Sequence, residues 1–143
     1  MKYLLDTCVI SELVKKVPHP EVITWMNDCD ESRLYLSVLT IGEIMKGIAK
    51  LPEGDKKERL RSWISNDLTV RFGQRILDID TEIAWAWGTM LGEAEGRGEK
   101  LPVIDSLIAV TANVHNLIVV TRNVSDPEHC RVKIFNPWDS QAD

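Results

Sequence analysis

The side chains that could do chemistry are acids spread along the whole chain. Asp6 follows a short apolar run, Glu43 follows a second one, and Asp105 stands at an expected helix start. Asn123 and Asp126 follow a later β-branched run, so a parallel sheet would gather these side chains at the edge where its strands end. Three or four such oxygen ligands, without cysteine or a suitably spaced histidine, are the set that Mg²⁺ or Mn²⁺ prefers. An ion held there would activate water for attack on a phosphodiester, which predicts metal-dependent phosphoryl chemistry.

Each acid also has a purely structural explanation, in a helix cap or a turn. Asp6 suits a helix N-cap, Asp105 is a favourable charge at a helix start, Asp126 suits a turn, and Glu43 would complete a capping box with Thr40. These explanations are independent of one another, whereas a metal site accounts for all the acids together. Convergence of the side chains at one sheet edge would therefore favour the metal site.

The elements that must position these residues alternate between strand and helix. Short apolar or β-branched runs predict strands at 3–5, 34–38, 75–79, 117–120 and 132–135. Helical spacing, caps and prolines predict helices at 9–14, 20–26, 40–51, 56–68, 80–95 and 102–114. This order predicts an α/β fold of three layers, α/β/α, around a central parallel sheet of about five strands, in a single domain over residues 1–143.

Composition restricts the class of protein. A hydrophobic fraction of 44% without any apolar run near the roughly 20 residues of a membrane span predicts no membrane segment. The N-terminus reaches Asp6 too early for a signal peptide, so the expected location is the cytoplasm. Cys8, Cys29 and Cys130 lack CxxC spacing, which predicts neither a disulfide framework nor a zinc site. The net charge of -5 argues against bulk attraction to nucleic acid, so phosphate must approach a local patch or a metal-filled site.

Five ordered segments resemble the motifs of PIN-domain proteins of the VapC and FitB type. They are residues 4–13, 40–48, 102–109, 121–126 and 136–138, with the sequences LLDTCVISEL, TIGEIMKGI, PVIDSLIA, TRNVSD and NPW. The resemblance implies a Mg²⁺- or Mn²⁺-dependent ribonuclease that is usually the toxin of a type II toxin–antitoxin pair and usually a dimer. It places the acidic triad on Asp6, Glu43 and Asp105, and a fourth position on Asn123 or Asp126.

The chain departs from the family pattern at two positions, neither of which is an expected ligand. Cys8 replaces a frequent asparagine, and Pro127 stands where an aromatic residue is common. A thiol donates a hydrogen bond poorly, so Cys8 would weaken a contact behind the ligands. Thr7 and Ser106, which adjoin two of the acids, would orient carboxylates or merely cap helices.

The resemblance also implies partners, and other classes stay open beside it. The expected partners are an RNA substrate, a second copy of the chain, and an antitoxin whose C-terminal segment places an arginine or lysine in the acidic edge. The alternatives are a receiver-like signalling module that binds Mg²⁺ and an inactive PIN scaffold. A receiver would need adjacent acids after its first strand, where this chain has Asp6 alone. The absence of GxGxxG and GxxxxGK[ST] disfavours Rossmann and P-loop enzymes.

Overall fold

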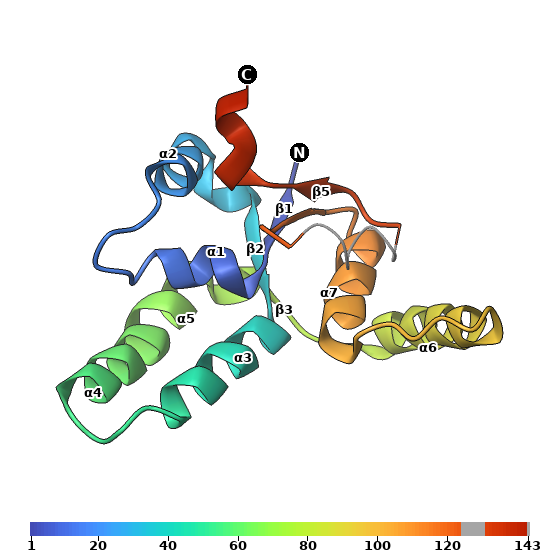
Figure 1. Cartoon of the computed structure of the whole chain (residues 1–143), viewed down its shortest axis with the longest axis horizontal. Helices are drawn as coiled ribbons and strands as arrows, with labels where there is room; N and C mark the ends of the chain where they lie inside the picture. The colour runs from blue at the N-terminus through green and yellow to red at the C-terminus, as the bar shows by residue number, and fades with distance from the viewer. Residues whose placement is uncertain (124–130, 143) are drawn as a thin grey trace.

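The computed structural model describes residues 1–123 and 131–142, the side chains being described as far as residue 139. Five parallel strands form one sheet in the order β3-β2-β1-β4-β5 (Figure 1). The strands are β1 (Tyr3–Leu5), β2 (Leu34–Ser37), β3 (Ile76–Leu77), β4 (Ile118–Val120) and β5 (Ile134–Phe135). The predicted five-stranded parallel sheet is therefore confirmed, although β3 and β5 are shorter than their sequence patterns indicated.

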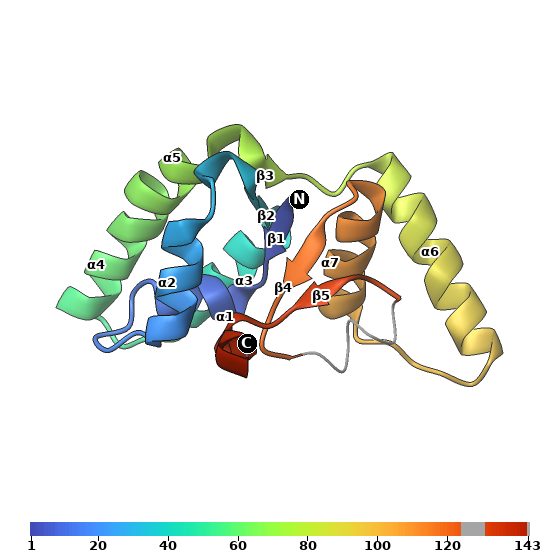
Figure 2. The ribbon, with the colours of Figure 1, turned by 90° about the horizontal axis from the view of Figure 1, so that it is seen from above.

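The α-helices of the described chain cover both faces of this sheet. They are α1 (Thr7–Glu12), α2 (Pro20–Asp28), α3 (Val38–Ala49), α4 (Asp55–Ser62), α5 (Thr69–Phe72), α6 (Thr81–Gly96) and α7 (Val103–Val114). Short helical turns complete the chain: η1 (Glu31–Arg33), η2 (Trp63–Leu68), η3 (Gly73–Arg75) and η4 (Pro137–Ala142). Figure 2 shows α2, α4 and α5 on one side of the strands and α7 followed by α6 on the other. The α/β/α layering predicted from the sequence is thus observed.

Helices cover both faces of the sheet. Because successive side chains of a strand point in opposite directions, neighbouring residues of one strand pack into different cores. Leu5 packs into one apolar core with Val9 of α1 and Phe72 of α5. Its neighbour Leu4 packs into a second core with Ile108 of α7. Each of these strand leucines is completely buried. Burial on both faces explains why the strand sequences are continuous apolar runs rather than alternating ones.

The helix after β2 begins earlier than the sequence indicated, and its cap is a different residue. The Ser37 hydroxyl accepts a hydrogen bond from the backbone N–H of Leu39 at 3.0 Å, so α3 starts directly at the end of the strand. Thr40 lies inside the helix, fully buried, and does not act as a cap. The predicted Thr40–Glu43 capping box is therefore wrong. Glu43 loses its structural explanation and lies in the second turn of α3.

The helix predicted at 56–68 is instead three joined segments that reach Phe72. After α4, the π-helical turn η2 carries the chain into α5, and the Thr69 hydroxyl donates to the Ile64 carbonyl at 2.6 Å. Ile64 and Leu68 of this turn are both buried in the core. Gly73 ends the helix with φ +48, a conformation that costs glycine little. By contrast, Asp80 caps α6 as predicted, because its carboxylate accepts from the Ile83 N–H at 2.9 Å.

A cluster of ion pairs at the edge of the sheet joins η1, which precedes β2, to α5 and η3, which precede β3. Arg71 contacts both carboxylate oxygens of Glu31 at 2.9 and 3.0 Å, and Arg75 adds a bond at 3.1 Å. The hydrogen bonds from Arg71, and then those from Arg75, hold the pKa of Glu31 below its usual range. A lowered folded-state pKa stabilises the protein above the unfolded value, and this stabilisation is lost as pH falls through the folded value.

We therefore expect Glu31→Gln to destabilise the protein at pH 7 but not in acid. Because the Glu31 side chain is 45% exposed, solvent screening limits the loss to about 1 kcal/mol or less. The difference in unfolding free energy between parent and variant should shrink below the ordinary glutamate pKa of about 4.3. Urea unfolding at pH 7 and pH 3.5 measures it. A difference that is the same at both pH values would contradict the assigned role.

Candidate active site

Asp6 stands at the end of β1, where its backbone still belongs to the sheet and its side chain does not. Its N–H donates to the Val120 carbonyl at 3.0 Å, which extends the β1–β4 ladder by one residue. One carboxylate oxygen, Oδ1, accepts from the Thr7 N–H at 2.8 Å, so Asp6 is the N-cap of α1 as predicted. The other oxygen, Oδ2, accepts from the Thr121 hydroxyl at 2.8 Å. Two neighbouring strands therefore fix this carboxylate at the sheet edge.

Thr7 connects Asp6 to Glu43 of α3. Its hydroxyl donates to Glu43 Oε1 at 2.6 Å, the length of a charge-assisted hydrogen bond, while its N–H bonds to Asp6. One residue thus holds two carboxylates that are 37 positions apart in the sequence. Of the two roles considered for Thr7, the contact with Glu43 favours the orientation of a carboxylate. Glu43 is half-buried, and its second oxygen, Oε2, makes no hydrogen bond within the described part of the chain.

Thr121 completes this arrangement, although the sequence analysis did not assign it a role. The residue follows β4, is completely buried, and donates its hydroxyl proton to Asp6. The same oxygen accepts from the Asn123 N–H at 3.1 Å and lies 3.6 Å from Cys8 Sγ. Thr121 thereby joins the carboxylate, the thiol and the loop after β4. The available signals were a hydroxyl directly after the most β-branched run of the chain and the position of Thr121 at the start of the segment TRNVSD.

Asp105 reaches the same edge of the sheet from α7. This helix packs against β4 and returns to it through a tight turn, in which the Leu117 N–H donates to the Ala112 carbonyl at 2.7 Å. Since α7 runs antiparallel to β4, its first turn, which contains Asp105, lies where the parallel strands end. A hollow of about 390 Å³ lies between α3 and α7. It is lined by Glu43 and Lys46 of α3 and by Ile104 of α7. Figure 1 shows α1, α3 and α7 all beginning near this edge.

Ser106 has a structural role rather than the orienting role that we considered for it. Its buried hydroxyl donates to the Val103 carbonyl at 2.9 Å and accepts from the Trp87 indole N–H at 3.0 Å. These bonds attach the first turn of α7 to α6. Trp87 therefore serves the contact between α6 and α7.

The fourth acidic position stays a prediction. Asn123 is exposed and contributes its backbone N–H to Thr121, and Asp126 lies outside the described residues, as do Pro127, His129 and Cys130. Within the ranges 1–123 and 131–142, no three histidine, cysteine, aspartate or glutamate side chains come close enough to hold a metal ion together. The structure thus links Asp6 to Glu43 through Thr7 and brings the helix of Asp105 to the same edge.

Glu12 is a buried carboxylate of α1 that sequence reasoning did not single out. It accepts hydrogen bonds from Lys15 Nζ at 2.6 Å and from the His19 N–H at 2.9 Å. Burial raises the pKa of the Glu12 carboxyl, but these hydrogen bonds, with the charges of Lys15 and Arg122, hold it below the usual range. Glu12 therefore anchors the chain that leaves α1.

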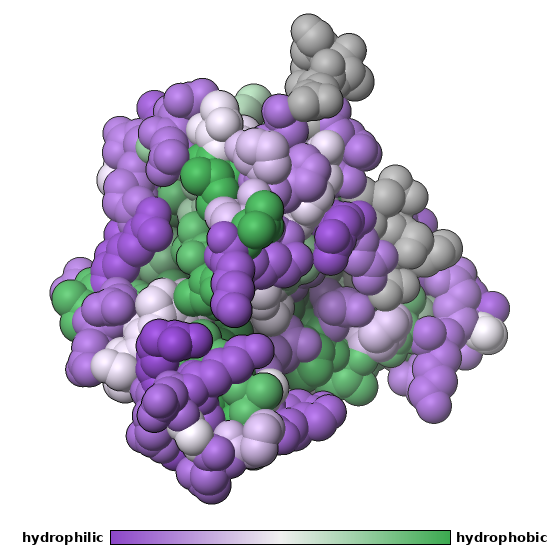
Figure 3. Space-filling model, turned by 60° about the vertical axis from the view of Figure 1, so that its left-hand side comes forward, coloured by the Kyte–Doolittle hydropathy of each residue, from purple (hydrophilic) through white to green (hydrophobic). Residues whose placement is uncertain are grey.

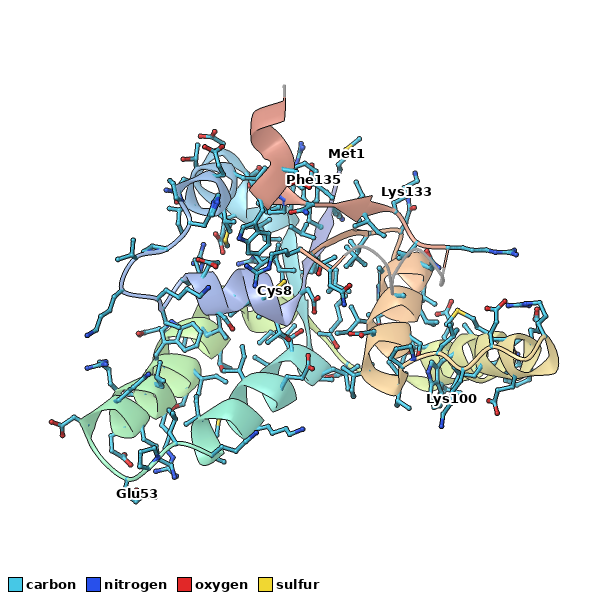
Figure 4. The ribbon with its side chains drawn as sticks, in the orientation of Figure 1. Met1, Cys8, Glu53, Lys100, Lys133 and Phe135 are labelled. Carbon is cyan, nitrogen blue, oxygen red and sulfur yellow. The ribbon has the colours of Figure 1, made fainter. Side chains whose placement is uncertain are left out.

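Other aromatic and basic side chains have different surroundings. Trp25 packs on Tyr3 and Phe135 against the first core, and the Arg122 guanidinium lies 4.8 Å from the centre of the Trp138 ring. Figure 4 shows Lys100 beside α6, well apart from Cys8 in α1. In the described part of the chain, no helix is long and apolar enough to cross a membrane.

Comparison with known proteins agrees with this fold. The protein-family model of the PIN domain matches residues 3–132 of this chain. The toxin FitB of Neisseria gonorrhoeae is 34% identical over 94% of this chain and 97% of its own length. The VapC ribonuclease Y4jK of Sinorhizobium fredii is 31% identical over 95% and 97%. The crystal structure of FitAcB from Neisseria gonorrhoeae superimposes with a TM-score of 0.89 at 34% identity, covering 96% of this chain and 99% of that one.

Proposed function

The chain belongs to the PIN-domain family, and on that premise we propose that it is a metal-dependent endoribonuclease that cleaves single-stranded or loop RNA. The proposal makes it the toxin of a type II toxin–antitoxin pair, acting in the cytoplasm as a homodimer that an antitoxin protein neutralises. Similarity to the toxin FitB and to a VapC ribonuclease along almost the whole chain supports it.

The observation that carries the proposal is the pair of carboxylates held by Thr7. If Asp6 served only to cap α1, no second acid would be needed beside it. Yet Glu43 Oε1 lies 2.6 Å from the hydroxyl oxygen of Thr7, the residue next to Asp6. Like charges are costly to hold together unless something offsets them. Asp6 and Glu43 are kept in place by Thr7 and Thr121, so their orientation does not depend on a bound ligand.

PIN-domain ribonucleases depend in general on divalent metal ions, and the side chains at this edge suit one. The atoms that would bind the ion are all oxygens. Because Mg²⁺ usually binds through one or two carboxylates and keeps several waters, three converging acids are not required. In this proposal Asp6 and Glu43 bind Mg²⁺ or Mn²⁺ directly, Asp105 and Asp126 bind it directly or through the waters that it keeps, and Asn123 is the alternative to Asp126. When bound, the ion supplies positive charge to the scissile phosphate and promotes loss of a proton from the attacking water.

Incubation of the purified chain with a labelled single-stranded RNA tests the proposal. We expect cleavage in Mg²⁺, none in EDTA, and recovery when Mn²⁺ is added in excess of the chelator. A perfectly paired duplex of the same sequence serves as control and should be cut slowly. Cleavage that continues unchanged in EDTA would exclude the metal-dependent mechanism.

Two other outcomes would favour the alternative classes. Tight RNA binding without cleavage in either metal would indicate an inactive PIN scaffold. Incorporation of phosphate from acetyl phosphate onto an aspartate, again without cleavage, would indicate a receiver-like module. Both outcomes would refute the proposed ribonuclease.

A further inference from the structure

A basic hollow opens on the side of the molecule where the end of α1 faces α4. It has a volume of about 1050 Å³, and the charged residues that line it are Lys15, Lys16, Lys56, Arg59 and a single acid, Asp67. Figure 3 brings this side forward and shows apolar side chains set between hydrophilic rims. Four cations against one acid are unusual for a surface of a protein whose net charge is -5. The hollow therefore has the local charge needed to attract an anion.

Three of these cations are not neutralised by the protein itself. Lys15 bonds to the buried Glu12, but Lys16, Lys56 and Arg59 are exposed and form no ion pair with any described residue. The other cations of α4 behave differently, because Lys57 pairs with Glu53 and Arg61 with Glu58. Among the described residues, the two cations of α4 that face the hollow, Lys56 and Arg59, are thus the ones without a counter-charge, and Lys16 joins them from the chain after α1.

The arrangement on α4 costs the helix some stability. Lys56 and Arg59 are three residues apart, a spacing at which side chains on a helix are neighbours and like charges repel. Leu60 and Trp63 lie on the same side of the chain and also line the hollow. An isolated chain gains nothing from this repulsion, whereas a polyanion bound in the hollow would relieve it.

The basic hollow continues directly into the candidate active site. A second hollow of about 260 Å³ shares Lys56, Leu60 and Trp63 with it and extends to Thr7 and Glu43. The two hollows also share Ser11 and Val14, and the remaining lining of the second comes largely from apolar side chains of α3, such as Ile44 and Ile48. One continuous surface therefore runs from Thr7 and Glu43, past an apolar wall with the aromatic ring of Trp63, to the cations that form no ion pair with a described residue.

We propose that this surface is the path of the substrate strand, so that phosphates of single-stranded RNA on one side of the scissile bond are held by Lys16, Lys56 and Arg59. The proposal rests on the proposed ribonuclease function. Cations that follow the backbone beside an apolar and aromatic wall for the bases are the features by which proteins bind single strands without reading sequence. The carboxylates repel phosphate, and the cations overcome this repulsion by binding the strand outside the site.

The test is a triple variant, Lys16→Gln, Lys56→Gln and Arg59→Gln, in the full chain. Its matched control is Lys2→Gln, Arg33→Gln and Lys133→Gln, which changes the net charge equally at residues that precede β1, β2 and β5, at the opposite edge of the sheet. Binding of a fluorescent oligouridine is measured by anisotropy in Ca²⁺ between 50 and 300 mM salt, and cleavage of the same RNA is measured in Mg²⁺. Thermal melts confirm that both variants are folded.

The hollow variant should bind RNA at least tenfold more weakly at 50 mM salt and cleave it correspondingly slowly at limiting RNA. The slope of log affinity against log salt should flatten by about 2, since each phosphate contact to a single strand contributes about 0.7. The control should keep the parental slope and cleavage. A hollow variant with parental affinity, slope and cleavage would overturn this path while leaving the ribonuclease intact. Failure of the parent to bind or cleave RNA would refute both proposals. Equal losses of RNA affinity in the two triple variants would show that only net charge matters, and this result would also overturn the path.

Discussion

Replacement of Asp6 by asparagine should abolish RNA cleavage without unfolding the metal-free protein. Asparagine caps a helix about as well as aspartate, and its Oδ1 can still accept from the Thr7 N–H. Its amide can donate to Thr121 Oγ1, whose proton then turns toward Cys8 Sγ, 3.6 Å away. The variant removes one negative charge from beside Glu43. In EDTA it should therefore be as stable as the parent or more so.

With metal present the two proteins should differ. Ion binding to the folded state raises stability by mass action, so Mn²⁺ should raise the melting temperature of the parent more than that of Asp6→Asn. Metal catalysis contributes several kcal/mol to such reactions, and each 1.4 kcal/mol is about tenfold in rate, so we expect cleavage to fall about 100-fold or more. Thermal melts in EDTA and in millimolar Mn²⁺, beside a cleavage assay, measure both effects. An active variant with the parental response to Mn²⁺ would show that Asp6 is only a cap.

Much of the fold could be predicted because buried strands and amphipathic helices leave local patterns. The run at 117–120 and the cap at Asp80 each depend on residues close together in sequence, and both are present as predicted. The error at Thr40 has the opposite cause. A Thr-x-x-Glu pattern is a local signal, but Ser37 already caps the helix and tertiary packing buries Thr40. Burial by distant elements cannot be read from four residues.

The candidate site was predictable in part for a related reason. Asp6 and Glu43 were expected together because parallel strands deliver their ends to one edge, and Thr7 joins them there. Thr121 could not be paired with Asp6 in advance, since 115 positions separate them and a threonine after a strand has many possible partners. Ser106 follows an acid in sequence as Thr7 does, yet its hydroxyl bonds to Trp87. Adjacency in sequence does not determine where a hydroxyl points.

Thr121→Val should weaken both the fold and the response to metal. Valine has nearly the same shape but removes the donor to Asp6 and the acceptor of the Asn123 N–H. A hydrogen bond to a charged group contributes roughly 1.5–3 kcal/mol, and we expect the free energy of unfolding in EDTA to fall by about that amount. Loss of a group that orients a metal ligand typically costs about 10–100-fold in metal affinity or activity. Thr121→Ser, which keeps the hydroxyl, is the matched control.

The dependence of cleavage on Mn²⁺ concentration separates a positioning role from a structural one. If Thr121 positions Asp6, the valine variant should need about 10–100-fold more Mn²⁺ for half-maximal rate, and excess Mn²⁺ should recover part of its activity, because the carboxylate is present but free to rotate. The serine variant should keep the parental Mn²⁺ requirement even if its melting temperature falls, since it lacks only the buried methyl group. A valine variant that is less stable but has an unchanged Mn²⁺ midpoint would limit Thr121 to packing. If Thr121→Val and Thr121→Ser both needed more Mn²⁺ for half-maximal rate, the effect would belong to the packing of the threonine side chain rather than to its hydrogen bond.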